Sequence, residues 1–324
     1  MANESTQNTF VIYDDEFNSS MMERLQVNIN VWNTSTYGGL VLTTKSLMGH
    51  FSKVSMYKAL AETVVTELDP TVEGATTWET FEAFENASVK VKRDVNLQKT
   101  VDAFRVMLVE PNATFSQVVG GLTADLITKD AIETGLGALV GAIQNDATHV
   151  LGDYTAAPTF SDINEAQFVY GDQFDNVACI LVHSNTARGL VDLNISEKLD
   201  SVAGFTIRTG NWATLGIPIV IADLTALTNT TNYNMLFLTK GALMVEASET
   251  VDAYTQIDLE SRPAMLKFKR EWAYNVGIKG YTYDYGTVGA YPTKAELATT
   301  ATWIRTCTSD KDLPCVLFKS LATS

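Results

Sequence analysis

The sequence predicts an α+β fold in which one long helix lies along a narrow sheet. Three observations support this: a helical hydrophobic period from Thr114 to about Asp146, apolar runs between Pro158 and Ala253, and a strict alternation from Leu266 to Ile278. Of the 324 residues, 46% are apolar and 19% are charged. The chain can therefore bury a sizeable core, and its composition is neither that of a disordered protein nor that of a membrane protein.

An acidic segment precedes the long helix. Residues 59–89 carry seven carboxylates and neither Lys nor Arg, and the charge changes sign directly after them. Three aromatic side chains recur within the segment at three-residue spacing: Trp78, Phe81 and Phe84. A proline and a glycine interrupt any regular period. We therefore predict a protruding loop over 68–86, followed by a strand over 87–93, where apolar and polar residues alternate.

The clearest helix signal begins just after Pro111. Thr114 and Gln117 form a capping box, and apolar residues then recur at helical spacing. At 1.5 Å per residue the predicted helix is ~48 Å long. Glycines inside a helix each cost about 1 kcal/mol relative to alanine. We expect another backbone to pack closely against the five glycines here: Gly120, Gly121, Gly135, Gly137 and Gly141.

Short elements of both kinds follow. Val177–Val182 and Leu215–Ile221 are typical of buried strands, and Ser184 can cap a short helix to about Leu193. Further strands are expected over 233–245, on both sides of Gly241. Beyond them, the alternating strand over 266–278 has one apolar and one polar face, and Lys267 and Lys269 lie on the polar face. Its length of ~43 Å matches that of the helix, so the two can lie side by side.

No residue pattern indicates an active site. The glycines between Gly135 and Gly141 miss the dinucleotide-binding spacing and lie inside the predicted helix. Cys179 and His183 are close in sequence, but the residues between them are typical of a strand, and tetrahedral zinc would lack two ligands. We therefore expect no enzymatic activity, no cofactor and no metal.

Charge and cysteine content restrict the partners and the compartment. The net charge of −15 repels phosphate backbones, so sequence-specific nucleic-acid binding is not expected. The three cysteines form no disulfide framework, which suits a reducing compartment. The first basic residue is Arg24, so no secretory signal is expected, and the longest uncharged stretch, Leu25–Thr44, is too polar to span a membrane.

The order of these features resembles that of tailed-bacteriophage major capsid proteins of the Hong Kong 97-like fold. Four segments are similar to tracts of that family: Leu215-Gly-Ile-Pro-Ile-Val-Ile-Ala-Asp223, Tyr233-Asn-Met-Leu-Phe-Leu-Thr-Lys-Gly-Ala-Leu243, Arg270-Glu-Trp-Ala-Tyr-Asn-Val-Gly-Ile-Lys-Gly280, and Pro292-Thr-Lys-Ala-Glu-Leu-Ala298 with Trp303. Together they cover about residues 60–324. Each tract alone is weakly specific, but their order and spacing together are fairly specific.

The resemblance implies a division of the chain and a function. It implies an N-terminal arm over 1–60, an extended loop over 61–93, a peripheral domain with the spine helix over 94–155 and 255–290, an axial domain over 156–254, and a C-terminal segment over 291–324 that packs on the axial domain, with 314–318 adding a strand. The implied protein assembles through hexamers and pentamers into an icosahedral or prolate head shell around double-stranded DNA, and it is located in the virion after assembly in the host cytoplasm.

The resemblance also implies partners. A separate scaffolding protein, a portal and decoration proteins are expected, and no membrane takes part. Family members that cross-link themselves use a Lys on the extended loop. Because residues 59–89 contain none, we do not transfer the cross-link to this chain.

We expect the acidic loop to contact a neighbouring subunit, with aromatic rings supplying energy and charges supplying register. The candidate interface residues are Trp78, Phe81, Phe84, Glu79, Glu82, Glu85, Lys90, Lys92, Arg93, Lys267 and Lys269. Alternatively, the rings pack on their own domain and the charges form solvated faces. Three other identities stay open: an encapsulin-like cellular compartment, an acidic enzyme of unrecognised family, and a fibre or adhesin.

Overall fold

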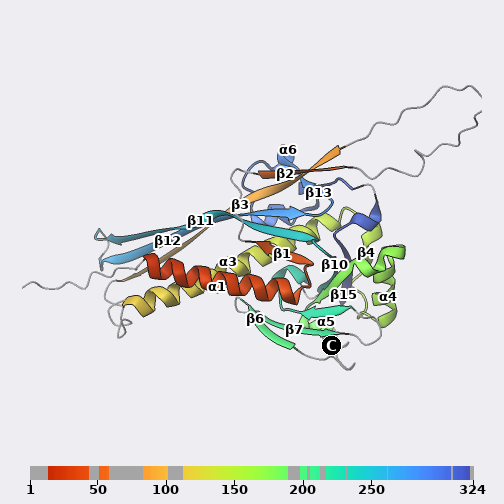
Figure 1. Ribbon diagram of the computed structural model, residues 1–324, viewed down its shortest axis with the longest axis horizontal. Coiled ribbons are helices and arrows are strands. Elements are labelled where there is room, and N and C mark those ends of the chain that lie inside the picture. Colours follow the sequence, from red (N-terminus) through yellow and green to blue (C-terminus); the bar gives the residue numbers. More distant parts are fainter. Residues whose placement is uncertain are drawn as a thin grey trace, which may run out of the picture.

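A computed structural model describes ten stretches of the chain: residues 14–43, 51–57, 83–100, 112–188, 198–202, 205–211, 217–230, 232–260, 262–307 and 309–321. These stretches form two large sheets, a two-stranded sheet and a layer of two long helices (Figure 1). No helix within them is long and apolar enough to cross a membrane.

The first sheet is long and narrow, and we call it the long sheet. Its strand order is β1 (Leu40–Thr43), β11 (Leu243–Asp258), β12 (Met265–Ile278), β3 (Ala83–Thr100) and β2 (Phe51–Tyr57). β1 pairs with β11 in parallel, and the other pairs are antiparallel. β12 is the alternating strand that the sequence predicts. It pairs along its length with β11 and β3, and the outer ends of β11 and β12 project beyond the two long helices, at the left of Figure 1.

The polar face of β12 is exposed only towards the end of the strand that begins at Met265. Lys267 and Lys269 have side chains that are 49% and 45% exposed, whereas Ala273 and Asn275 are each 2% exposed. The chain after β12 covers this inner part of the face, because the Tyr285 hydroxyl donates to a carbonyl of β3. The opposite face contains one cation, Arg270, which is fully buried with its guanidinium 4.3 Å from the centre of the Phe268 ring.

The predicted long helix is α3 (Asn112–Ile143). It starts two residues before the expected cap at Thr114 and ends before Asp146, where the short 3-10 helix η2 (Ala147–His149) follows. Backbone does pack closely against one glycine, because a Cβ added at Gly141 would lie 2.6 Å from the backbone of Ala298. At Gly121 the same addition meets nothing within 4 Å. The expectation of close backbone packing therefore holds at Gly141, whereas Gly135 is approached by the Leu243 side chain, and the expectation is wrong at Gly121.

A second long helix, α1 (Asp14–Ser35), lies beside α3, where the sequence predicted only an arm. Arg24 forms an ion pair of 3.1 Å with Asp125 of α3, and Asn28 donates to the same carboxylate at 2.7 Å. Trp32, which is fully buried, anchors the far end of α1 in the core. The two helices run in the same direction, since Ser20 and Asn28 of α1 bond to Gln117 and Thr128 of α3 respectively.

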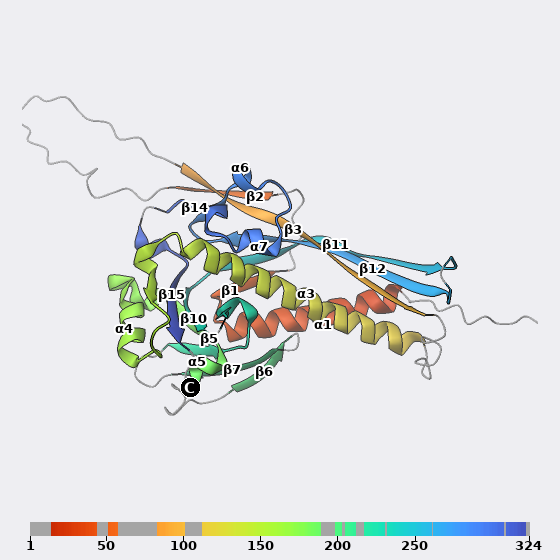
Figure 2. The same ribbon diagram turned by 180° about the vertical axis from the view of Figure 1, so that it is seen from behind.

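The second sheet, which we call the mixed sheet, forms the rounded end of the molecule (Figure 2). Its order is β4 (Val150–Gly152), β15 (Cys315–Leu321), β10 (Asn232–Thr239), β5 (Val177–Val182), β8 (Pro218–Ile221), β7 (Phe205–Asn211) and β6 (Lys198–Val202), and β9 (Thr228–Asn229) pairs with β10. β5 and β8 confirm two predicted buried strands, and β15 confirms the strand expected over 314–318.

Both faces of the central strands of the mixed sheet are covered, which explains why β5 and β8 are unbroken apolar runs. Leu236 and Leu238 of β10 pack in the same core cluster as α3, whereas Met235 and Phe237 pack in a second cluster with α4 (Phe160–Phe168). Next to β5 lies α5 (Ser184–Ala187), which is shorter than predicted within the described residues. Its cap is the His183 ring, which accepts from the Asn185 N–H, so the prediction that Ser184 is the cap is wrong.

The remaining elements are short, and four of them pack against α3. These short elements are β13 (Tyr281–Tyr283), α6 (Tyr285–Val288), α7 (Lys294–Leu297), β14 (Trp303–Arg305) and the 3-10 helices η3 (Gly171–Asn176), η4 (Thr225–Leu227), η5 (Thr300–Thr302) and η6 (Asp310–Asp312). Glu133 of α3 accepts backbone bonds of 2.7 and 2.9 Å from Thr225 and Ala226 of η4. The domain boundaries implied by the resemblance stay a prediction. However, β11 continues as an unbroken strand through the predicted boundary between residues 254 and 255.

Candidate assembly surfaces

The acidic loop falls largely outside the part of the chain that the structure describes. Trp78, Glu79, Phe81 and Glu82 lie outside the described residues. The other two candidate residues of the acidic loop, Phe84 and Glu85, lie in β3. Their backbones pair with Met56 and Ser55 of β2. The predicted loop end at 86 is therefore wrong, because β2 supplies a partner strand that extends β3 back to Ala83.

The three basic residues that follow the acidic segment have different environments. Lys90 is only 4% exposed, and its register partner on β12 is Asn275. Lys92 is exposed and lies 5.4 Å from the centre of the Tyr291 ring, a cation–π contact within the same chain. Arg93 forms a 3.3 Å ion pair with Asp130 of α3. Of the three, Lys92 alone has an exposed side chain.

Lys267 and Lys269 lie together on the exposed part of the long sheet. Lys267 is paired with Asp258 at 2.7 Å, and Lys269 is paired with Glu271. The hydrogen bond that Lys269 donates to Glu271, together with the negative charge of that carboxylate, raises the pKa of Lys269 above its usual value. Both lysines line a groove of about 500 Å³, together with Asn96, Leu97, Gln98, Tyr254, Gln256 and Phe268. Two cations and several amides suit an acidic, extended peptide, because amides can bond its backbone.

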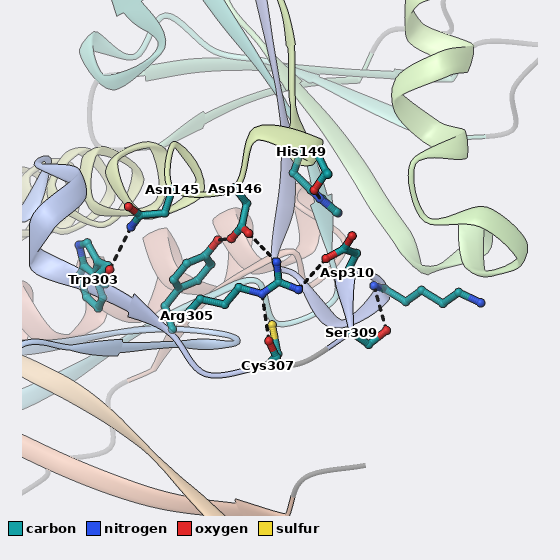
Figure 3. A network of polar contacts seen from close by, with 11 residues as sticks. Asn145, Asp146, His149, Trp303, Arg305, Cys307, Ser309 and Asp310 are labelled. Carbon is teal, nitrogen blue, oxygen red and sulfur yellow. Dashed lines mark hydrogen bonds and ion pairs between the residues drawn. The ribbon is translucent and has the colours of Figure 1, made fainter. Parts of the chain in front are cut away.

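A buried polar network joins the end of α3 to the C-terminal segment (Figure 3). Asp146, whose side chain is 10% exposed, accepts from the Tyr281 hydroxyl and from Arg305 Nη1, the latter at 2.5 Å. Arg305 also bonds Asp310 at 2.6 Å and the Cys307 carbonyl at 2.9 Å. Burial, reinforced by Asp146, raises the pKa of Tyr281 well above its usual value. The network therefore fixes three segments that lie far apart in sequence.

Two further bonds extend the network. The Asn145 amide donates to the carbonyls of Thr300 and Trp303, each at 2.9 Å, and thereby holds the C-terminal segment against the end of α3. His149 is fully buried beside Asp310, and its ring lies 5.5 Å from that of Tyr170. Burial holds the pKa of His149 below its usual value. The ring therefore forms part of the packing between the end of α3 and the C-terminal segment.

The described residues contain no group of three or more His, Cys, Asp or Glu side chains placed to hold a metal ion. Cys179 and His183 lie on β5 and directly after it, as their sequence context predicted. His183 instead contacts Asp223 at 3.4 Å and lies 4.4 Å from the Tyr233 ring. The contacts of this histidine are structural: it caps α5 and packs on its neighbours.

Solved structures of phage proteins are similar to this chain over most of its length. A chain from Microbacterium phage Oxtober96 is 13% identical, with 88% of this chain and 90% of that chain covered and a TM-score of 0.53. A chain from the head structure of Helicobacter pylori bacteriophage KHP40 is 10% identical, with 88% and 87% covered and a TM-score of 0.51. The fold is thus the Hong Kong 97-type fold of phage capsid proteins, as the sequence predicted.

The sequence itself identifies the family. The chain belongs to the major capsid protein 13-like family, whose model matches residues 9–317. No curated protein matches it. The predicted role is therefore confirmed: the protein forms the capsid shell of a bacteriophage from copies of itself. It is a structural protein of the virion.

Proposed function

We propose that this chain builds an icosahedral or prolate head shell, through hexamers and pentamers, around double-stranded phage DNA that it does not bind specifically. The family match over residues 9–317 supports this proposal. The net charge of −15 suits it as well, because an acidic lining repels densely packed phosphates and leaves the DNA free to exit. Under this proposal the protein has no enzymatic activity.

In this proposal the acidic segment of one copy lies over the groove of a neighbour. The segment carries seven carboxylates without a cation of its own, and the groove carries Lys267 and Lys269 on an exposed strand. Each lysine already has a partner in its own chain, so an incoming carboxylate joins or displaces Asp258 or Glu271. Exposed pairs of this kind contribute about 0.2 to 1 kcal/mol each. The charges therefore set register, and Trp78, Phe81 and Phe84 supply most of the contact energy.

A Trp78→Ala variant tests the proposed contact between the acidic segment of one copy and the groove of its neighbour, which we call the loop clasp. We expect shell assembly to be abolished or strongly impaired while the monomer stays folded, measured by light scattering and negative-stain microscopy, with circular dichroism to check the fold. Phe168→Ala is the matched control, because Phe168 is an aromatic residue that is 54% exposed on α4, away from the groove. Lys267→Gln should shift only the salt dependence of assembly. Wild-type assembly of the Trp78→Ala protein would refute the loop clasp and leave the family assignment intact.

The remaining parts of the proposal concern partners and place. We propose that a separate scaffolding protein, a portal and decoration proteins complete the head, and that assembly takes place in the host cytoplasm. The proposed division keeps 1–60 as an arm, 61–93 as the extended loop, 94–155 with 255–290 as the peripheral domain, 156–254 as the axial domain and 291–324 as the C-terminal segment. The β10–β15 pairing supports the last, since it attaches that segment to the mixed sheet.

A further inference from the structure

The N-terminal half of α3 carries an exposed apolar stripe. Val118, Leu122 and Leu126 are 55%, 59% and 49% exposed and follow one another at four-residue spacing, so they lie along one face of the helix. Single exposed apolar residues are common on protein surfaces, but a row of three on one helix face is typical of a contact surface. Gln117 and Lys129, both exposed, bound the stripe at its two ends.

The fold explains why this face has no partner within the described part of the chain. One side of α3 faces the long sheet, where Asp130 accepts from the Tyr274 hydroxyl at 2.6 Å, and another side faces α1, where Asp125 is bonded to Arg24. The stripe occupies the remaining side. Figure 2 shows this half of α3, in yellow, extending beyond the mixed sheet, and the three apolar side chains on it are exposed.

We propose that the stripe packs against the same stripe of a second copy, across a twofold axis that passes beside Leu122. Val118 and Leu126 lie at equal distances from Leu122, four residues or ~6 Å to either side. In an antiparallel pair of helices, each Leu122 therefore meets the other Leu122, and each Val118 meets a Leu126. A twofold contact requires such a self-complementary surface, and the family already assembles from copies of one chain.

The charges beside the stripe and the area that it can bury are both consistent with a contact to a second copy of the chain. The carboxylate beside the stripe, Asp125, is already bonded to Arg24 and Asn28, so a second helix can approach without desolvating an unpaired charge. Three half-exposed side chains supply far less than the ~1,000 Å² that a stable isolated interface buries. The contact is therefore weak between free monomers and becomes effective where other contacts hold the copies close together. Such a weak contact allows misplaced subunits to dissociate during assembly.

A charge-swap experiment tests the twofold contact in the full-length chain. Leu122→Glu and Leu122→Lys each place two like charges face to face, so each variant alone should lose most of its yield of closed shells on a density gradient. An equimolar mixture allows Glu to meet Lys, and because the mixed pairs are favoured over the like-charged pairs, it should recover a large part of the wild-type yield. Ile304→Glu is the control, because Ile304 is 50% exposed but isolated on β14, and it should assemble normally. Circular dichroism of the monomers checks that each variant is folded.

Disulfide trapping gives a second, independent readout. Leu122→Cys in a Cys307→Ser background leaves only the two buried native thiols, Cys179 and Cys315. Oxidised shells of this variant should contain disulfide-linked dimers, and shells of a Phe168→Cys control should not. Normal assembly of both charged variants, or two defective variants whose mixture is not rescued, would overturn the twofold contact. Both results are distinct from failure of the loop clasp, which depends on Trp78.

Discussion

Removing Arg305 should destabilise the folded chain much more than removing an exposed arginine. The Arg305→Met variant keeps most of the side chain's apolar volume but leaves Asp146, whose side chain is 10% exposed, without its cation. Breaking a buried ion pair from one side costs about 3 to 5 kcal/mol, because the remaining charge is left desolvated. Loss of the bond to Asp310 adds little to this destabilisation, because the Asp310 side chain is 49% exposed and water replaces the lost partner.

The expected loss lies at the low end of that range, about 3 kcal/mol. The Tyr281 hydroxyl still donates to Asp146 in the variant, so the carboxylate keeps one hydrogen bond. A double variant, Asp146→Asn with Arg305→Met, should recover about 1 kcal/mol or more of the loss, because it removes the unpaired charge. The matched control is Arg24→Met, whose pair with Asp125 is exposed at the arginine and should cost about 0.2 to 1 kcal/mol.

Urea unfolding of the monomer, followed by tryptophan fluorescence, measures these differences. Trp303, one of five tryptophans, donates to the carbonyl of Leu297 and lies on the same strand as Arg305, so the total emission includes a signal from the segment that the network holds. The free energies are comparable if the dependence on urea concentration is unchanged between variants. An Arg305→Met protein that is no less stable than Arg24→Met would refute the reasoning, because Asp146 would then not depend on the buried pair.

Three further predictions follow from buried groups and close contacts. Burial lowers the pKa of His149 from its ordinary value of 6.5, so the unfolded chain binds a proton at a higher pH than the folded chain does. The stability of the folded chain therefore falls as the pH drops from 6.5 towards the lowered pKa. His149→Phe should make this decline shallower, as measured by urea midpoints across that pH interval. Gly141→Ala should destabilise by about 1 to 3 kcal/mol because its Cβ meets backbone, whereas Gly121→Ala should stabilise by about 0.5 to 1 kcal/mol, both measured by thermal unfolding. Cys307, which is half-buried, should react with a thiol reagent well before Cys179, whose pKa burial raises to about 12; equal rates in the folded protein would contradict this.

The elements with a strong local period could be predicted from the sequence. The capping box and the helical spacing located α3 to within a few residues, and the alternation located β12. The α1 helix was missed because its pattern is weak: Asn28 lies on its buried face, and Met22 and Val27 lie exposed on its outer face. A helix whose two faces are so alike carries little hydrophobic period.

The contacts between distant segments could not be predicted in this way. Asp146 bonds to Tyr281 and Arg305, which are 135 and 159 positions away, and nothing near Asp146 in the sequence indicates such partners. The same holds for Lys90, which an alternating pattern places on a polar face but which the chain after β12 helps to bury. Charge sign and face can be read from sequence, whereas burial depends on what folds over the face.

The part of the long sheet formed by β3, β11 and β12 is so long that a small rotation at its inner end moves its outer end by a large distance. β12 is 14 residues long, or ~46 Å, and it is paired on both sides, so it bends little. A rotation of roughly 10° about its inner end displaces the outer end by ~8 Å, more than the ~4.8 Å that separates two strands. A small change of orientation at the mixed sheet therefore shifts the outer tip by more than one strand position. A contact made at this tip is therefore displaced much further by such a rotation than a contact made at the mixed sheet.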